Sequence, residues 1–351
     1  MPTEVARSAR PPNEFVPSPS ADTFRPVRPI GRCVITAGTS EAAFGSPAAP
    51  VTVGETRQRG AYTAGMPELP FVEALVENLR PLAEGRTTED VIVRSVYVLK
   101  TFDPPVTDIK GRRIAAIHRR GKLLVFDLTG GLVMIIHLRR NGRLQVVPRG
   151  KGRTARDLAI TFALDGGMDL RMIEMGPKKA ASLWLFPAGQ ETKTEPLAGL
   201  GLEPLSPEFT REALADMLGV ERTHLKRFLG LQRHVVGIGN AFSDEILWEA
   251  RLSPQAMTTS LDGDEVARLH GAIRRVLEEA VASHRREFAG SLPMREPVHL
   301  LRVHRHGKEP CPRCGTPIAV IYYEDRETYY CPTCQAGGRV YADRRRSRLL
   351  R

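Results

Sequence analysis

The chain has 351 residues, of which 42% are hydrophobic, enough for two or three domains with buried cores. Lys and Arg number 51 against 40 acidic residues, and the net charge of +11 favours a nucleic acid as partner, with an anionic membrane surface as the second choice. Because no apolar run approaches the roughly 20 residues of a membrane-spanning helix and the start lacks a secretion signal, we expect a cytoplasmic location.

Residues 1–65 differ in composition from the rest of the chain. They contain nine of the 27 prolines and no leucine, the commonest core residue, so we predict a disordered extension. The extension could bind DNA loosely or be removed later. The stretch GAYTAGMPELP at 60–70, in which MPELP looks like a protein start, favours a third interpretation, in which the working protein begins at Met66.

From Met66 the pattern becomes that of a folded domain. Residues 68–82 carry leucines and valines near helical spacing after a proline-rich entry, which predicts a helix. Short β-type runs follow, with turns predicted at Gly130-Gly131 and at 165–167. The predicted strands are 91–99, 113–118, 123–128, 132–138, 143–147, 158–164, 169–173 and 182–186. So many short strands predict a β-sandwich or barrel.

After residue 201 the pattern turns helical. The predicted helices are 207–218, 223–229, 241–250 and 262–287, with Asp262 as an N-cap. Between two of them, the Gly-Ile-Gly turn at 237–239 precedes a helix N-terminus, whose free N–H groups suit a phosphate. Asn240 could add its amide and Lys226 its charge to such a site. A plain turn between helices is the alternative interpretation.

Four of the five cysteines form two close pairs near the C-terminus. Cys311, Cys314, Cys331 and Cys334 have the spacing of a two-knuckle zinc site, and we predict one zinc ion. Four protein ligands leave no open position, so the metal should be structural. The hairpin between the pairs carries Arg326 and would suit a nucleic-acid backbone.

Taken together, the motifs resemble a known family. They are MPELP at 66–70, RRGKLL around Lys122, VVGIGNAFSDE at 235–245 and RETYYC ending at Cys331. From Met66 onward the chain resembles the bacterial formamidopyrimidine-DNA glycosylase and endonuclease VIII family, and Leu69 rather than glycine is more similar to the formamidopyrimidine branch. The resemblance implies an α+β protein with an N-terminal β-sandwich, a helix–two-turn–helix domain and a C-terminal zinc-finger hairpin. The expected divisions are an extension at 1–65, a catalytic domain at 66–195, a DNA-binding domain at 196–300 and a zinc finger at 301–345 with a basic tail to 351.

The resemblance also implies a reaction. Members of this family are DNA glycosylases with abasic-site lyase activity, acting on oxidised bases in base excision repair. Their nucleophile is the amine of an N-terminal proline, here Pro67, which forms a Schiff base with the sugar C1′ and leads to β,δ-elimination. Glu68 matches the carboxylate that transfers protons. The implied partner is damaged double-stranded DNA, and a monomer associated with the nucleoid, without a membrane partner, is expected.

Other motif positions imply contacts to DNA. Lys122 matches a lysine beside the lesion phosphate, and Asn240 and Arg326 match two groups that clamp the backbone. Glu245 matches a supporting carboxylate of the active site.

Three departures from the family pattern put the choice of lesion in doubt. The usual glutamate four residues after the proline is Phe71. The void-filling methionine and phenylalanine positions hold Arg140 and Ala180, and residues 288–303 lack the family's lesion-covering stretch. We expect Arg139, Arg140, Lys178 and Lys179 to line the DNA groove by attraction to phosphates.

Two alternatives stay open. A divergent site or a blocked Pro67 would leave a damaged-DNA-binding protein without catalysis. An RNA-binding zinc-ribbon protein would leave the MPELP match unexplained.

Overall fold

The structure, a computed structural model, describes residues 66–151, 157–176, 179–323 and 326–341. The predicted extension 1–65 and Lys178 lie outside these ranges. The first element is helix α1 (Leu69–Ala83), with Pro70 in its first turn and Glu68 at its N-cap. Proline suits the first turn because the N–H it lacks would have no helical partner there. The buried face of α1 has the spacing expected of an amphipathic helix and comprises Leu69, Val72, Leu75, Val76 and Leu79.

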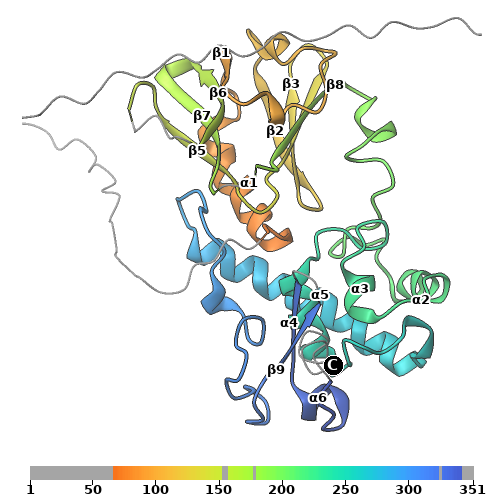
Figure 1. Ribbon diagram of the computed structural model, residues 1–351. Coiled ribbons are helices and arrows are strands. Elements are labelled where there is room, and N and C mark those ends of the chain that lie inside the picture. The colour runs from red at the N-terminus through yellow and green to blue at the C-terminus, as the bar shows by residue number, and fades with distance from the viewer. Residues whose placement is uncertain (1–65, 152–156, 177–178, 324–325, 342–351) are drawn as a thin grey trace, which may run out of the picture. The chain divides into compact units, whose positions relative to one another are not determined.

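Two four-stranded sheets pack on each other in the N-terminal half (Figure 1). One has the order β1-β6-β7-β5 and the other β2-β3-β4-β8, with every neighbouring pair antiparallel. The first sheet comprises β1 (Thr88–Val93), β6 (Leu158–Leu164), β7 (Met168–Glu174) and β5 (Gly142–Pro148). The second comprises β2 (Ile114–Arg120), β3 (Leu123–Leu128), β4 (Leu132–His137) and β8 (Ser182–Pro187). The predicted β-sandwich is confirmed.

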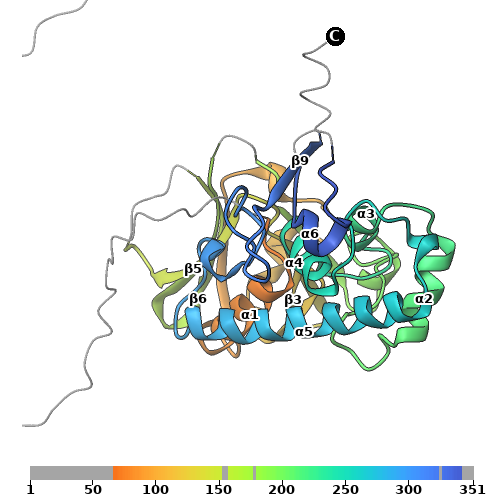
Figure 2. The same cartoon turned by 90° about the horizontal axis from the view of Figure 1, so that it is seen from below.

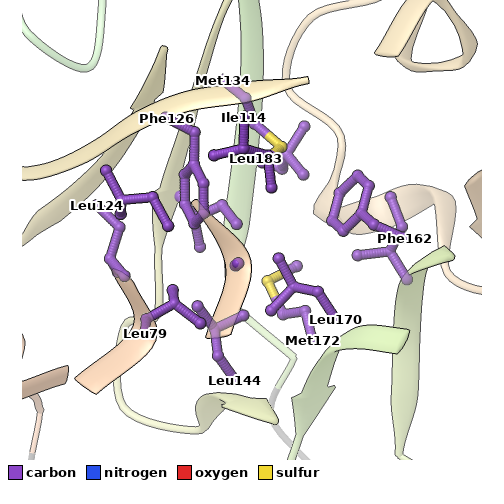
Figure 3. Packing of buried hydrophobic residues seen from close by; sticks show 14 of the residues in the cluster. Leu79, Ile114, Leu124, Phe126, Met134, Leu144, Phe162, Leu170, Met172 and Leu183 are labelled. Carbon is purple, nitrogen blue, oxygen red and sulfur yellow. The ribbon is translucent and has the colours of Figure 1, made fainter. Parts of the chain in front are cut away.

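The core of the sandwich draws side chains from both sheets and from α1. Figure 3 shows Phe126 and Met134 of one sheet facing Phe162 and Met172 of the other, with Leu79 of α1 beside them. All five are at most 1% exposed. Burial of this apolar surface holds the two sheets together.

The predicted strand 91–99 divides in the structure. Strand β1 ends at Val93, and a 3₁₀ turn, η1 (Val96–Val98), follows it. The N–H groups of Arg94 and Ser95 both donate to the carbonyl oxygen of Ala159, at 2.9 and 3.0 Å. This shared acceptor ends the regular ladder, and the chain then crosses to the edge of the other sheet.

A helical region follows the sandwich. It contains α2 (Arg211–Val220), α3 (Leu225–Leu229), α4 (Asn240–Ala250) and α5 (Gly263–Glu287). The helix predicted from residue 207 begins four positions later because the Thr210 side chain caps it by accepting from the N–H of Ala213. Asp262 and Glu265 form a capping box at α5, which confirms the predicted N-cap. In Figure 2 the long α5 lies beside α1, and an ion pair between Arg285 and Glu77 joins them.

The last described elements form a small cysteine-rich module. Strands β9 (Ala319–Tyr323) and β10 (Arg326–Tyr330) make a hairpin, and the short helix α6 (Pro332–Ala336) follows. The remaining 3₁₀ turns are η2 (Val106–Ile109), η3 (Asp165–Gly167), η4 (Glu191–Lys193), η5 (Thr258–Ser260) and η6 (Val298–Leu300). None of the described helices combines the length and apolar character needed to cross a membrane.

Candidate active site

Glu68 lies where the N-termini of two helices meet. Its side chain is 3% exposed and accepts hydrogen bonds from the N–H groups of Gly239, Ala241 and Phe242, at 2.6, 2.9 and 3.1 Å. These donors belong to the first turn of α4 and the residue before it, where backbone N–H groups lack helical partners. Three donors and the positive end of the helix dipole stabilise a carboxylate at this buried position.

The glycine turn before α4 brings this carboxylate together with Lys122. A Cβ atom at Gly239 would lie 2.5 Å from Glu68 Oε1 and 2.8 Å from Lys122 Nζ. The turn also touches α1 at Gly237, whose carbonyl oxygen accepts from the N–H of Leu69 at 3.0 Å. Gly237 has a φ of +85°, a conformation that favours glycine. The sequence motif around the two glycines is therefore a close-approach turn that holds Glu68 and Lys122 side by side.

Positive charges gather around Glu68. Burial lowers the pKa of Lys122, the nearby charges of Arg139 and Arg326 add to the lowering, and Glu68 opposes it. Lys122 immediately precedes β3, while Arg326 begins β10. The structure thus brings together Glu68, Lys122 and Arg326, three residues that the sequence analysis singled out from distant parts of the chain.

His137 and Arg139 belong to the same group. The sequence analysis expected Arg139 along the DNA groove and gave His137 no role. Their position follows from the β3–β4 register, which pairs His137 with Leu123, the neighbour of Lys122. His137 Nδ1 accepts the N–H of Arg139 at 2.9 Å, and Arg139 adopts a φ of +51°. Burial, Arg139 and Lys122 lower the pKa of His137 to about 3, so that its imidazole is neutral near pH 7. Counting residues outward from the Gly130-Gly131 turn would have revealed this pairing.

Asn240 connects α4 to the cysteine-rich module. Its side-chain Nδ2 donates to the carbonyl oxygen of Glu327 at 2.9 Å, one residue beyond Arg326. The bond holds the start of β10, and with it Arg326, beside the N-terminus of α4. The two residues that the resemblance assigns to clamping the DNA backbone are therefore neighbours.

Lys226 has a different environment from the one expected of an exposed phosphate ligand. Its Nζ donates to the carbonyl oxygen of Asn240 and to Asp244 Oδ1, both at 2.6 Å. The other oxygen of Asp244 contacts His304 Nδ1 at 2.7 Å, and the Asp244 side chain is fully buried. This network fastens the first turn of α4 to α3 and to the chain before the cysteine module.

Glu245 also contacts backbone. Its buried carboxylate accepts from the N–H groups of residues 302, 303 and 304, at 2.9, 2.9 and 2.8 Å. Burial raises the pKa of Glu245, and the three hydrogen bonds oppose the rise. The contacts anchor the segment that leads into the cysteine module.

The remaining predicted residues have mixed environments. Pro67 is buried, and its nitrogen is in the peptide bond to Met66. Arg140 and Lys179 are both exposed, and Lys179 Nζ pairs with Asp157 Oδ1 at 2.9 Å. Of the predicted groove-lining cations that the structure describes, Arg140 and Lys179 are thus exposed and Arg139 is half-buried.

At the position of the family's missing glutamate, Phe71 makes a cation–π contact. Phe71 is fully buried, with the guanidinium carbon of Arg143 5.8 Å from the centre of its ring. Another buried carboxylate, Glu296, lies in the same region, where burial raises its pKa and the charge of Arg143 opposes the rise. Its Oε1 is 3.4 Å from His284 Nε2.

The four cysteines form the predicted metal site. The Sγ atoms of Cys311, Cys314, Cys331 and Cys334 all lie within 4.8 Å of one another. The indole N–H of Trp248 donates to Cys311 Sγ at 3.3 Å, a contact that stabilises the sulfur as a thiolate ligand. This donor set fits one structural zinc ion, because four thiolates in a compact group satisfy tetrahedral coordination.

Replacing Cys314 by Ser should remove the zinc and weaken DNA binding. The hairpin that carries Arg326 is too small to fold without its metal. We expect metal analysis to find one zinc per chain before the change and little after it, with DNA affinity at least about tenfold lower. The unmodified chain, carried through the same metal and binding measurements, is the control. Full zinc content in the Cys314 variant would contradict the assignment.

Comparison with known proteins matches the three parts of the chain in order. Residues 66–176 match the formamidopyrimidine-DNA glycosylase N-terminal domain, 200–289 its H2TH domain, and 308–337 the zinc finger found in FPG and IleRS. The formamidopyrimidine-DNA glycosylase of Symbiobacterium thermophilum is 39% identical over 276 residues, which cover 77% of this chain and 89% of the relative. The formamidopyrimidine-DNA glycosylase of Pelotomaculum thermopropionicum is 34% identical over 278 residues, which cover 77% of this chain and 99% of the relative.

Solved structures of formamidopyrimidine-DNA glycosylases also match this chain. A point mutant of Fpg from Lactococcus lactis, in complex with DNA, matches with a TM-score of 0.70 and 26% identity over 77% of this chain and 100% of its own. The MutM (Fpg) protein of Thermus thermophilus matches with a TM-score of 0.66 and 33% identity. The match covers 77% of this chain and 98% of the Thermus chain. With the sandwich, the glycine turn beside Glu68 and the four-cysteine hairpin all in the matched regions, the chain belongs to the formamidopyrimidine-DNA glycosylase family.

Proposed function

We propose that this chain is a DNA glycosylase with abasic-site lyase activity that removes oxidised bases in base excision repair. The observation that carries the proposal is the arrangement next to Pro67. A buried carboxylate, Glu68, is held by three backbone N–H groups, Lys122 lies close to it, and Arg326 is near enough for its charge to act on Lys122. A carboxylate that exchanges protons beside cations that bind phosphate is what cleavage at a damaged nucleotide requires.

In the proposed reaction, a free amine at Pro67 attacks C1′ of the damaged nucleoside. The bond from C1′ to the base breaks, and the base leaves with the bonding electrons and takes up a proton. Glu68 transfers protons as the sugar ring opens to an iminium. Loss of a C2′ proton then expels the 3′ phosphate, and a second elimination expels the 5′ phosphate. Lys122, Arg326 and Asn240 would hold the backbone phosphates during these steps.

The amine must be free for this reaction, so we propose that the working protein begins at Pro67, after loss of residues 1–65 and Met66. Support comes from the match to the N-terminal domain of the family, which begins at residue 66. The Pelotomaculum relative is matched over 99% of its own length by 77% of this chain.

We further propose the domain divisions 66–195, 196–300 and 301–345, and a monomer as the working form. In this arrangement α1 contributes to two cores, because Leu69 packs with the helical region while Phe71 packs in the sandwich. Arg140, Lys178 and Lys179 would add charge along the DNA groove. The structural contacts of Lys226 and Glu245 favour positioning roles for these two residues.

The proposal is tested with duplexes that contain single damaged bases. The Lactococcus lactis protein has been crystallised with DNA containing Fapy-dG, an oxidised pyrimidine or an abasic site, so the panel should include all three. With a chain that starts at Pro67, borohydride should trap a covalent complex with at least one damaged duplex and with none of the undamaged ones. Binding of damaged duplex without any trapping would instead support the non-catalytic alternative.

A further inference from the structure

The turn after β1 exposes two neighbouring apolar side chains. Tyr97 is 85% exposed and Val96 61% exposed, although the adjacent Val98 is fully buried. Val98 packs in the core of the sandwich, and this packing fixes the position of the turn. Adjacent large apolar side chains held toward solvent are typical of a surface that meets another molecule.

Backbone contacts locate this turn at one end of the sandwich. On one side, Arg94 and Ser95 donate to Ala159 at the start of β6. On the other, Leu99 forms a parallel bridge with Leu183 in β8, and the N–H of Lys100 donates to the carbonyl oxygen of Leu183 at 2.8 Å. Because the bridge is parallel, the residues before Leu99 lie toward the residues before Leu183.

The same end of the sandwich carries the catalytic group. Strand β8 starts at Ser182, which pairs with His137, and His137 pairs with Leu123 next to Lys122. Ala180 lies just before Ser182. Tyr97, Ala180 and Lys122 therefore belong to one end of the two sheets.

Charge around the turn suits DNA. Arg94 and Lys100 are exposed on either side of Tyr97, and Lys100 Nζ donates to the carbonyl oxygen of Tyr97 at 2.7 Å. Two cations can contact phosphates while the ring between them contacts a base, the usual combination on surfaces that bind unstacked nucleic acid.

A nucleotide that leaves the duplex leaves a gap that must be filled. In this chain the positions expected to supply apolar wedges hold Arg140 and Ala180, so neither supplies an apolar aromatic ring. We propose that Tyr97, supported by Val96, inserts into the duplex beside the extruded nucleotide and fills the gap. The proposal rests on the proposed function, since it requires damaged DNA at this end of the sandwich.

The test uses binding alone, so that it does not depend on the state of Pro67. The full chain is titrated with a duplex that contains a tetrahydrofuran abasic analogue and with the matched intact duplex. Tyr97→Ala should lower the preference for the abasic duplex about tenfold, because the stacking of the ring on a base is lost. Tyr97→Phe keeps the ring and should keep the preference. The dependence of affinity on salt should stay unchanged, since no charge is removed.

Phe102 provides the matched control. It is 67% exposed and follows Thr101, whose Oγ1 donates to the carbonyl oxygen of Leu185, so it lies farther along β8 from the catalytic end. Phe102→Ala should leave the preference unchanged. If Tyr97→Ala leaves the preference for the abasic duplex unaltered, or if Phe102→Ala lowers it equally, the role proposed for Tyr97 is overturned. The proposed function is not affected by either result. If the unmodified chain does not prefer the abasic duplex, the proposed function fails and the assignment of Tyr97 fails with it.

Discussion

A protein that begins at Pro67 should form a covalent complex with damaged DNA on borohydride reduction, and the full chain of 351 residues should not. Within the full chain the nitrogen of Pro67 is part of a peptide bond, and its lone pair is delocalised into the carbonyl group. Such a nitrogen cannot attack C1′. Because the nucleophile is lost completely, we expect strand cleavage to differ by about a thousandfold or more.

The comparison separates chemistry from binding. Both proteins should prefer damaged to undamaged duplex, because Lys122, Arg326 and Asn240 are present in each. Mass spectrometry of the N-terminus must accompany the assay, since partial removal of residues 1–66 would give the full chain apparent activity. A trapped complex formed by a chain that retains its first 65 residues would refute the role of a free Pro67. Failure of both proteins to trap, with binding intact, would favour a damage-binding protein without catalysis.

Gly239→Ala should abolish most of the activity while leaving a folded protein. The added methyl group would lie 2.5 Å from Glu68 Oε1 and 2.8 Å from Lys122 Nζ, well inside van der Waals contact. One or both groups must move, and displacement of a catalytic group by about 1 Å costs roughly a hundredfold in rate. Overpacking at a buried site costs about 1–3 kcal/mol of stability, which thermal unfolding would record.

Gly271→Ala is the matched control for this change. Gly271 lies within α5, and a Cβ there would meet no atom within 4 Å. Alanine has the higher helix propensity, so the control should be as stable as the parent or more stable by about 1 kcal/mol, with full activity. Equal cleavage rates in the two variants would show that the close contact at Gly239 does not matter for the reaction.

The order of elements was accessible from the sequence because each depends on local spacing. The strands that flank Gly130-Gly131 and the capping box at Asp262 follow from residues close to each other in the chain. The division of the predicted strand 91–99 did not follow, because its cause is an acceptor more than sixty positions away, Ala159. Periodicity cannot reveal a contact with a distant segment.

The candidate site shows the same difference. The motifs supplied Pro67, Glu68, Lys122, Asn240 and Arg326 as residue types, and the structure brings the last four into one group. It also adds His137, to which the sequence gave no role, and it places Arg139, expected along the DNA groove, beside Lys122. Lys226 and Glu245 have the types expected of ligands, yet their partners are Asp244 and the backbone of 302–304.

By itself the sequence determined the zinc ligands, the alternation of strands and helices, and the presence of a proline whose amine is blocked by the residues before it. Each of these depends on covalent order or on neighbours a few residues apart. Only the tertiary structure decided that Glu68 and Lys122 both lie beside the glycine turn, that Lys226 is held in a buried ion pair, and that Tyr97 lies at the catalytic end of the sandwich. These facts depend on packing between distant segments, where burial and exclusion of overlapping atoms select one arrangement among the many that the local pattern allows.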